Sequence, residues 1–143
     1  MKKTKIKLKN FEILIKGLKS LKRREWYFGS LIREYIAEKT CGTVCCALGW
    51  LPRFFPRKME WVNHSPYFLG ARRKGKEDWS SSNIYSYLFG IPSNHEDALF
   101  NNDRQYTLGL KNLAKNCTVL EFIKMLREYI KKVKKGDYEE VGV

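Results

Sequence analysis

The stretch CGTVCCALGWLP, residues 41–52, is the most distinctive part of the sequence. Thr43 can act as an N-cap, with its hydroxyl accepting a hydrogen bond from a backbone amide of the first turn, and Pro52 favours a helix end. Residues 44–51 between them are apolar on every side, which is typical of a helix buried inside a domain. Gly49 within that helix predicts another element packed closely against its backbone. We therefore expect a single, mainly α domain around a central buried helix at about residues 44–51.

The segment before this stretch predicts an amphipathic helix with a basic outer face. Residues 10–24 place apolar side chains at three- and four-residue spacing and leave lysines outside that stripe. Asn10 is a residue type that favours the N-cap position. Residues 1–9 alternate in part between lysine and apolar residues, so we expect a short strand or a solvated arm there.

Four further helices are expected in the second half of the chain. Serine, threonine, glycine and proline mark their ends, and the pairs Ser93/Glu96 and Thr118/Glu121 have the spacing of capping boxes. We expect the polar tail at 134–143 to fray. The expected helices start at Ser80–Ser82 and end at Gly90, run from Ser93 to Phe100, from Leu108 to Lys115, and from Val119 to Val133.

Residues 53–79 lack a helical period and are the least regular part of the chain. They contain two prolines, several aromatic residues and the basic run RRKGK at 72–76. A long irregular segment in a compact domain is often functional. We expect a loop anchored by aromatic side chains within 54–79, with room for a short β-hairpin between Tyr67 and Trp79.

Length and composition limit the class of protein. The 143 residues suit one domain, and a hydrophobic content of 43% excludes an intrinsically disordered chain. No apolar run approaches the roughly 20 residues of a membrane-spanning helix, and no signal-peptide pattern follows the charged N-terminus. The four cysteines are not spaced like a disulfide framework, which favours reduced thiols. We expect a soluble, cytoplasmic protein with no cofactor.

Positive charge is concentrated in the first half of the chain. Residues 1–76 hold 19 Lys and Arg against 5 Asp and Glu, whereas residues 77–143 hold 9 against 10, and the net charge is +13. A one-sided positive field attracts polyanions or acidic protein surfaces. A lysine-rich composition that serves only solubility is the alternative explanation.

Cations and aromatic rings are interspersed between residues 53 and 79. Lys and Arg neutralise phosphates and exposed rings stack on bases, so this combination predicts a nucleic-acid-binding surface. Trp, Tyr and Arg are also the usual anchors of protein interfaces, and rings buried beneath the loop would leave the cations merely solvated. The candidate binding residues are Arg53, Arg57, Lys58, Trp61, Arg72, Arg73, Lys74 and Lys76.

The string CGTVCCALGW at 41–50 resembles the pattern C-G-T-x-x-C-x-x-G-W of a loose family of small, largely uncharacterised phage and prophage proteins. The strings YLFGI at 87–91 and ALF at 98–100 are similar to later parts of that pattern. The basic run at 72–76 is not part of it, and Cys45 stands where the family more often has alanine. The resemblance implies a phage or mobile-element origin and a helical fold, with no agreed activity. The residues that match its structural motif are Cys41, Gly42, Thr43, Cys46, Gly49 and Trp50.

We therefore expect a non-enzymatic phage accessory protein, in the host-cell cytoplasm, that binds nucleic acid or a host nucleoprotein through its basic, aromatic-rich surface. The alternative is an inhibitor of a host defence or metabolic enzyme that acts by protein contact alone. A basic protein would need an acidic patch on such a partner.

Cys41 supports a third interpretation, a thiol-dependent enzyme. It lies just before the predicted N-cap, where a helix dipole lowers the pKa of a thiol. His64 or His95 could serve as its base, although the spacing does not match that of papain-like proteases. A zinc site formed by Cys41, by Cys45 or Cys46 and by the two histidines lacks the short Cys/His pairs typical of structural zinc. We therefore expect Cys41 and Cys46 to be structural, with no metal and no catalytic residue.

Overall fold

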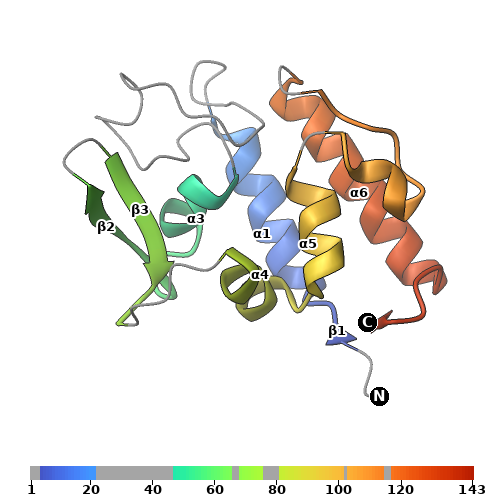
Figure 1. Ribbon diagram of the computed structural model, residues 1–143, viewed down its shortest axis with the longest axis horizontal. Coiled ribbons are helices and arrows are strands. Elements are labelled where there is room, and N and C mark those ends of the chain that lie inside the picture. Colours follow the sequence, from blue (N-terminus) through green and yellow to red (C-terminus); the bar gives the residue numbers. More distant parts are fainter. Residues whose placement is uncertain (1–3, 22–46, 66–67, 76–80, 102, 115–116) are drawn as a thin grey trace.

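The computed structural model describes residues 4–21, 47–65, 68–75, 81–101, 103–114 and 117–143. The chain is mainly helical, which confirms the predicted fold class. None of the helices in these ranges is both long enough and apolar enough to cross a membrane. The elements drawn in Figure 1 are β1 (Thr4–Lys5), α1 (Leu8–Lys19), α3 (Ala47–Phe54), β2 (Met59–Ser65), β3 (Phe68–Arg73), α4 (Ser81–Phe89), α5 (Ser93–Phe100), the 3₁₀ helix η2 (Gln105–Leu108), α6 (Val119–Lys135) and β4 (Val141–Gly142).

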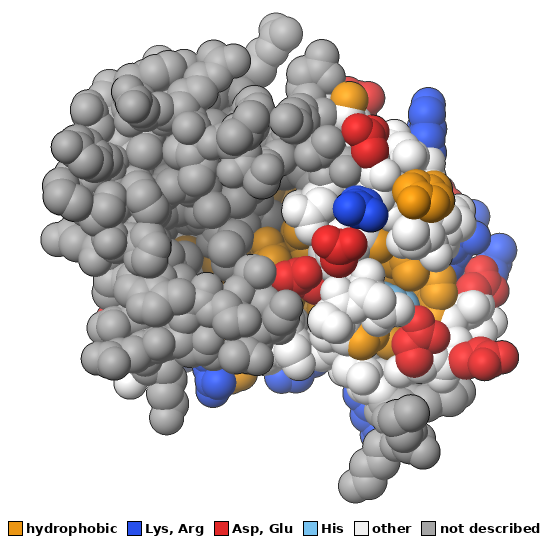
Figure 2. Space-filling model, viewed as in Figure 1, with side chains coloured by type: hydrophobic (Ala, Val, Ile, Leu, Met, Phe, Trp, Pro, Cys, Tyr) orange, Lys and Arg blue, Asp and Glu red, His pale blue; other side chains and the backbone are white. Residues whose placement is uncertain are grey.

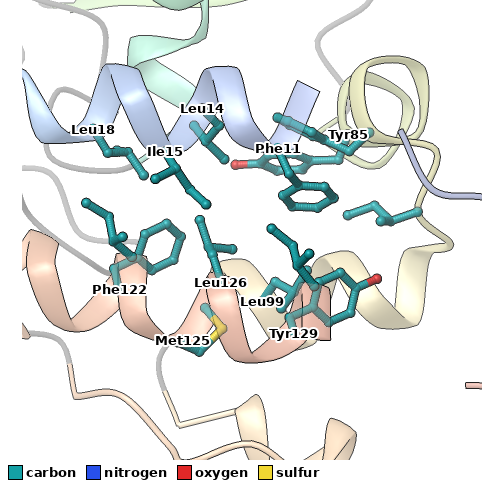
Figure 3. Close-up of a cluster of buried hydrophobic side chains, with 14 of the residues drawn as sticks. Phe11, Leu14, Ile15, Leu18, Tyr85, Leu99, Phe122, Met125, Leu126 and Tyr129 are labelled. Carbon is teal, nitrogen blue, oxygen red and sulfur yellow. The ribbon is translucent and has the colours of Figure 1, made fainter. Parts of the chain in front are cut away.

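Helices α1 and α6 pack against each other and supply much of the hydrophobic core. Figure 3 shows Phe11, Ile15 and Leu18 of α1 directed toward α6. Phe122 and Leu126 of α6 face them, and all five side chains are buried. Burial of each such side chain contributes about 1.5–3 kcal/mol relative to exposure. The apolar spacing of both segments predicted these two faces.

The start of α6 agrees closely with its sequence pattern. The Glu121 amide donates to the Thr118 hydroxyl (3.1 Å), and the Thr118 amide donates to Oε1 of Glu121 (2.9 Å). The predicted capping box is therefore confirmed. The hydrogen bonds from the backbone and side chain of Thr118 lower the pKa of Glu121. The helix ends at Gly136, whose φ of 78° is left-handed.

Helix α1 begins two residues before Asn10, so the predicted N-cap is wrong. Asn10 instead donates from Nδ2 to the Leu88 carbonyl (2.6 Å). Lys7 donates from its amide to the Phe89 carbonyl (2.8 Å) and from Nζ to the Tyr87 carbonyl (2.7 Å). The last carbonyls of a helix have no partner within that helix. The start of α1 therefore caps the end of α4, and helix-boundary rules based on neighbouring residues do not describe such a contact.

Gly90 follows α4 directly and permits a close approach to β1. Its φ is 67°, and a Cβ at this position would collide with the carbonyl oxygen of Lys5. Glycine adopts this conformation without the steric cost that a side chain adds. The predicted end of the helix at Gly90 is confirmed, and its tertiary reason is the backbone of β1.

The C-terminal residues, which were expected to fray, are packed. Strand β4 pairs in parallel with β1, with Thr4 opposite Val141, and Val141 is buried. The Ile6 amide donates to the Gly142 carbonyl (2.8 Å). Figure 1 shows β1 close to the C-terminal end of the chain. The polar tail gave no signal of this pairing because its partner strand lies at the opposite end of the sequence.

Helix α3 differs in its bounds from the predicted 44–51 helix. It runs from Ala47 to Phe54 and includes Pro52, while residues 44–46 lie outside the described ranges. Pro52 does not end it, because the Phe55 amide still donates to the Leu51 carbonyl (2.7 Å). Proline restricts the residue before it and removes its own donor, and neither effect prevents the next residues from remaining helical.

Helix α3 is packed beside the centre of the molecule rather than at it. Trp50 and Leu51 are buried, as expected. However, α1 occupies the middle of the helices, and α3 lies between α1 and the β2–β3 hairpin (Figure 1). A close contact at a glycine is present at Gly17 of α1, where a Cβ would overlap the ring of Phe54.

Strands β2 and β3 form the antiparallel hairpin that was expected within 54–79. Met59 pairs with Arg73 and Ser65 with Phe68, and the register shifts between Asn63 and Ser65. The hairpin therefore occupies 59–73 rather than the predicted stretch from Tyr67 to Trp79.

Helices α4 and α5 have nearly the predicted bounds, but the start of α5 is not capped as expected. Its N-cap is Pro92, with no hydrogen bond from a capping side chain. Ser93 is already the first helical residue, so the predicted Ser93/Glu96 capping box is wrong. Glu96 is buried instead of reaching back to the helix start.

The helix predicted from Leu108 to Lys115 is absent from the described part of that stretch. The short η2 ends at Gly109, with a φ of 73°, and residues 110–114 are without regular structure. The buried Gln105 side chain donates to the Ala98 carbonyl (2.8 Å) and accepts from the Leu113 amide (2.7 Å). These tertiary hydrogen bonds hold the backbone where local propensity favoured a helix.

Candidate nucleic-acid interface

Two basic segments that are distant in the sequence meet at one end of the hairpin. The pairing of Met59 with Arg73 places the start of β2 beside the end of β3. One residue further, the Lys74 amide donates to the Lys58 carbonyl (2.9 Å). The sheet pairing therefore brings the cations before β2 together with those that end β3.

A tight turn between α3 and β2 presents its cations outward. The amides of Lys58 and Met59 donate to the Phe55 carbonyl (3.0 and 2.9 Å). Phe55 and Met59 are buried, whereas Arg57 and Lys58 are exposed. The two buried side chains fix the turn to the core, and the cations between them face solvent.

We call Arg57, Lys58, Arg73 and Lys74 the basic surface. Arg57, Lys58 and Lys74 are exposed, and no described Asp or Glu forms an ion pair with any of them. The nearby Glu60 accepts a hydrogen bond from the Gly75 amide (3.1 Å). Like charges gathered without counterions repel one another, so an anionic partner would lower the energy of this surface.

Arg73 differs from the other three cations because it rests on an aromatic ring. Its guanidinium lies 3.9 Å from the centroid of Tyr87, which belongs to α4 and is half-buried. Lys7 Nζ lies 5.6 Å from the same centroid and also donates to the Tyr87 carbonyl. Tyr87 thus gathers cations from β3 and from the start of α1. No sequence pattern indicated this role, because Tyr87 belongs to a predicted helix and to the string YLFGI, and neither implies a contact with cations.

The aromatic rings near the basic surface mostly face inward. Phe55 is buried, Phe54 packs over Gly17, and Trp50 is 5% exposed beneath the guanidinium of Arg53 (5.5 Å). The described rings therefore support the cations and offer little free surface to a base. Arg53 itself is exposed in the last turn of α3, just before the turn that carries Arg57.

The remaining candidate residues are described only in part or lie outside the described ranges. Trp61 and Arg72 are in β2 and β3, paired with Ala71 and Glu60, and their side chains lie outside the described part. Lys76 and the motif residues Cys41, Gly42, Thr43 and Cys46 also lie outside the described residues, and Gly49 and Trp50 belong to α3.

A second polar cluster lies around His95 in the interior. His95 is fully buried, with Nδ1 2.8 Å from the Tyr129 hydroxyl and Nε2 2.7 Å from Oε1 of Glu140. Tyr138 packs edge-on against the imidazole (4.9 Å) and donates its hydroxyl to the Leu108 carbonyl (2.8 Å). Among the described residues, every buried side-chain nitrogen and oxygen has a hydrogen-bond partner.

This His95 cluster (His95, Tyr129, Tyr138 and Glu140) holds the C-terminal segment against α5 and α6. Burial raises the pKa of Tyr138 to about 12, and burial also raises the pKa of Tyr129. The hydrogen bond from His95 lowers the pKa of Glu140. Both ring nitrogens of His95 have partners within the fold, so the cluster leaves neither of them for a metal ion or a thiol.

A cavity of about 580 Å³ lies between residues 109–114 and 117 on one side and α6 on the other. Lys111, Lys124 and Lys132 line it together with Glu121 and Glu128. Glu121 is engaged in the capping box, and Lys132 forms an ion pair with Asp137 (3.8 Å). This mixture of charges selects no class of ligand, and none of the predicted binding residues borders the cavity.

One face of the molecule contrasts in charge with the basic surface. On the face drawn in Figure 2, Asp and Glu side chains gather over the described right-hand part, while Lys and Arg side chains appear mainly at its edges. No group of three or more His, Cys, Asp and Glu side chains in the described ranges could hold a metal ion. Comparisons with protein-family models, curated proteins and solved structures gave no match to this chain.

Proposed function

We propose that this chain is a non-enzymatic accessory protein that binds nucleic acid through the basic surface. The observation that carries the proposal is the pairing of β2 with β3, which joins the cations of two separate segments at one place. None of the four cations has an acidic partner among the described residues, so their donors are available to phosphate oxygens.

The described geometry favours contacts with the phosphate backbone over contacts with bases. Phe54, Phe55 and Trp50 are turned into the fold, so this part of the surface offers charge and hydrogen-bond donors. Phosphate contacts position a protein on nucleic acid and carry little sequence information. We therefore expect binding that depends steeply on salt and weakly on sequence.

The test measures binding of fluorescent 20-nucleotide single strands and 20-base-pair duplexes of DNA and RNA between 50 and 200 mM salt. In the variant Arg57→Ser/Lys58→Ser/Lys74→Ser, each lost phosphate contact should reduce the log–log salt slope on a DNA duplex by about 0.9. The matched control is Lys131→Ser/Lys134→Ser/Lys135→Ser, which removes the same charge from exposed positions of α6. We expect the control to keep most of the affinity.

Two outcomes would contradict the proposal. Equal losses in both variants would show that binding follows net charge and not the basic surface. A wild-type protein that binds none of the four probes at 50 mM salt would instead favour the acidic surface of a protein partner, the alternative role of an inhibitor acting by protein contact.

A further inference from the structure

Arg73 combines three properties, and the first two of them are not shared by the other cations of the basic surface. It is half-buried, it lies 3.9 Å from the ring centroid of Tyr87, and no described residue accepts a hydrogen bond from its guanidinium. A guanidinium is planar and carries its five N–H donors in that plane. A ring that covers one face therefore leaves the edge of the donor fork open.

The helix end that carries Tyr87, the ring under Arg73, is held by hydrogen bonds from α1 and the residue before it. Tyr87 lies in the last turn of α4, and its carbonyl accepts a hydrogen bond from Lys7 Nζ (2.7 Å). The Lys7 amide and the Asn10 side chain hold the next two carbonyls of the same helix end. The backbone that carries the Tyr87 ring is thus held at the junction of α1 and α4.

We infer that Tyr87 is a positioning residue that holds the guanidinium of Arg73 as a two-pronged donor for one phosphate group. The inference rests on the proposed function and adds a chemical requirement to it. An arginine free in solvent loses side-chain entropy when it orders on a ligand, whereas one already stacked on a ring loses less. Lysine keeps the charge but supplies neither the plane nor the fork, so Arg73→Lys is not a conservative change here.

Five variants test this role: Tyr87→Phe, Tyr87→Leu, Arg73→Lys, Arg73→Ala and the double variant Tyr87→Leu/Arg73→Lys. Tyr87→Phe keeps the ring and should bind the 20-base-pair DNA duplex like wild type. Loss of the cation–π contact in Tyr87→Leu should weaken binding about two- to fivefold. Because the charge remains, the salt slope should stay unchanged in Tyr87→Leu and Arg73→Lys, whereas Arg73→Ala should reduce it by about 0.9.

The double variant tests whether Tyr87 affects the affinity only through Arg73 or independently of it. If Tyr87 acts through Arg73, Tyr87→Leu/Arg73→Lys should lose little more affinity than the weaker of its two parent variants. Additive losses, or a Tyr87→Phe variant as weak as Tyr87→Leu, would overturn the inference. If Tyr87→Leu does not fold, Arg73→Lys and Tyr87→Phe still decide it, since wild-type affinity in Arg73→Lys would also overturn it.

A titration with inorganic phosphate, followed by the NMR signal of Arg73 Nε–H, distinguishes this inference from the proposed function. If added phosphate shifts this signal in wild type and Tyr87→Phe but not in Tyr87→Leu, the result supports a donor positioned by Tyr87, even if no nucleic acid binds. Nucleic-acid binding with an Arg73 signal that is the same in wild type and Tyr87→Leu would leave the proposed function intact and reject the role of Tyr87.

Discussion

The molecule contains two clusters in which aromatic rings meet nitrogen-bearing side chains, and one is closed while the other is open. In the His95 cluster, both imidazole nitrogens have partners within the fold. In the cluster of Arg73, Lys7 and Tyr87, the ring covers one face of the guanidinium and no described residue accepts from its edge. The first cluster joins parts of the fold, and the second has donors left for another molecule.

The difference follows from the cost of leaving a polar group without a partner. A buried donor or acceptor without one costs about 1–3 kcal/mol, so the interior cluster has to be complete. An exposed cation stays hydrated and loses little when it has no protein partner. An incomplete polar cluster at the surface is therefore compatible with a stable fold, whereas the same arrangement in the core is not.

Removal of His95 should have the largest effect on stability. His95→Ala leaves the buried Tyr129 hydroxyl without its partner and opens a cavity, so we expect a loss of about 2–4 kcal/mol in the free energy of unfolding. Urea denaturation followed by circular dichroism measures it. The matched change in the open cluster, Arg73→Ala, should cost less than about 1 kcal/mol. Equal losses in the two variants would end the distinction between a closed and an open cluster.

Substitution of Gly90, which connects the two clusters through β1, should have the next largest effect on stability. Gly90 contacts β1, which pairs with β4 on one side and leads to Lys7 on the other. Gly90→Ala combines the strain of a left-handed φ, about 1–2 kcal/mol, with a collision against the Lys5 carbonyl. Gly136→Ala is the control, because it has a φ of 78° and no atom within 4 Å of its Cβ. Thermal denaturation should show a larger decrease in melting temperature for Gly90→Ala than for Gly136→Ala. Equal decreases would mean that β1 moves away from the added methyl group at little cost.

The smallest effect is expected at Glu140, the rim of the closed cluster, whose side chain is 46% exposed. Its pKa is lowered in the folded state, so its contribution is present above the unfolded value of 4.5 and is lost as the pH falls through the folded pKa. Glu140→Gln should cost less than about 1 kcal/mol at pH 7. The difference from wild type in urea denaturation should shrink between pH 6 and pH 3. A difference that stays constant over this range would show that the carboxylate charge contributes nothing.

Apolar spacing and caps predicted the helices that bury one continuous stripe. The segment from Val119 to Val133 is helical, its Thr118/Glu121 capping box is present, and α4 ends at Gly90. The same local rules failed at Ser93, where Pro92 is the N-cap and Ser93 is already helical, and at Leu108–Lys115, where the buried Gln105 forms hydrogen bonds that those rules do not include.

The candidate site was predictable as a set of residues but not as an arrangement. The basic run near Arg73 and the pair Arg57 and Lys58 were visible as charge. Their meeting depends on the register of Met59 against Arg73, and hydrophobic alternation in this segment was too weak to give that register. Tyr87 was missed because a half-buried tyrosine on a helix has the same sequence pattern as a core residue.

The sequence by itself determined the mainly helical class, the apolar faces of α1 and α6 and the location of the positive charge in the first half of the chain. These properties depend on residues a few positions apart, within the reach of helical periodicity and capping. Only the tertiary structure decided that β1 pairs with β4, that Lys7 and Asn10 cap α4, and that Arg73 rests on Tyr87. Each of these contacts joins segments far apart in the chain, where packing geometry, and not local propensity, selects the partner.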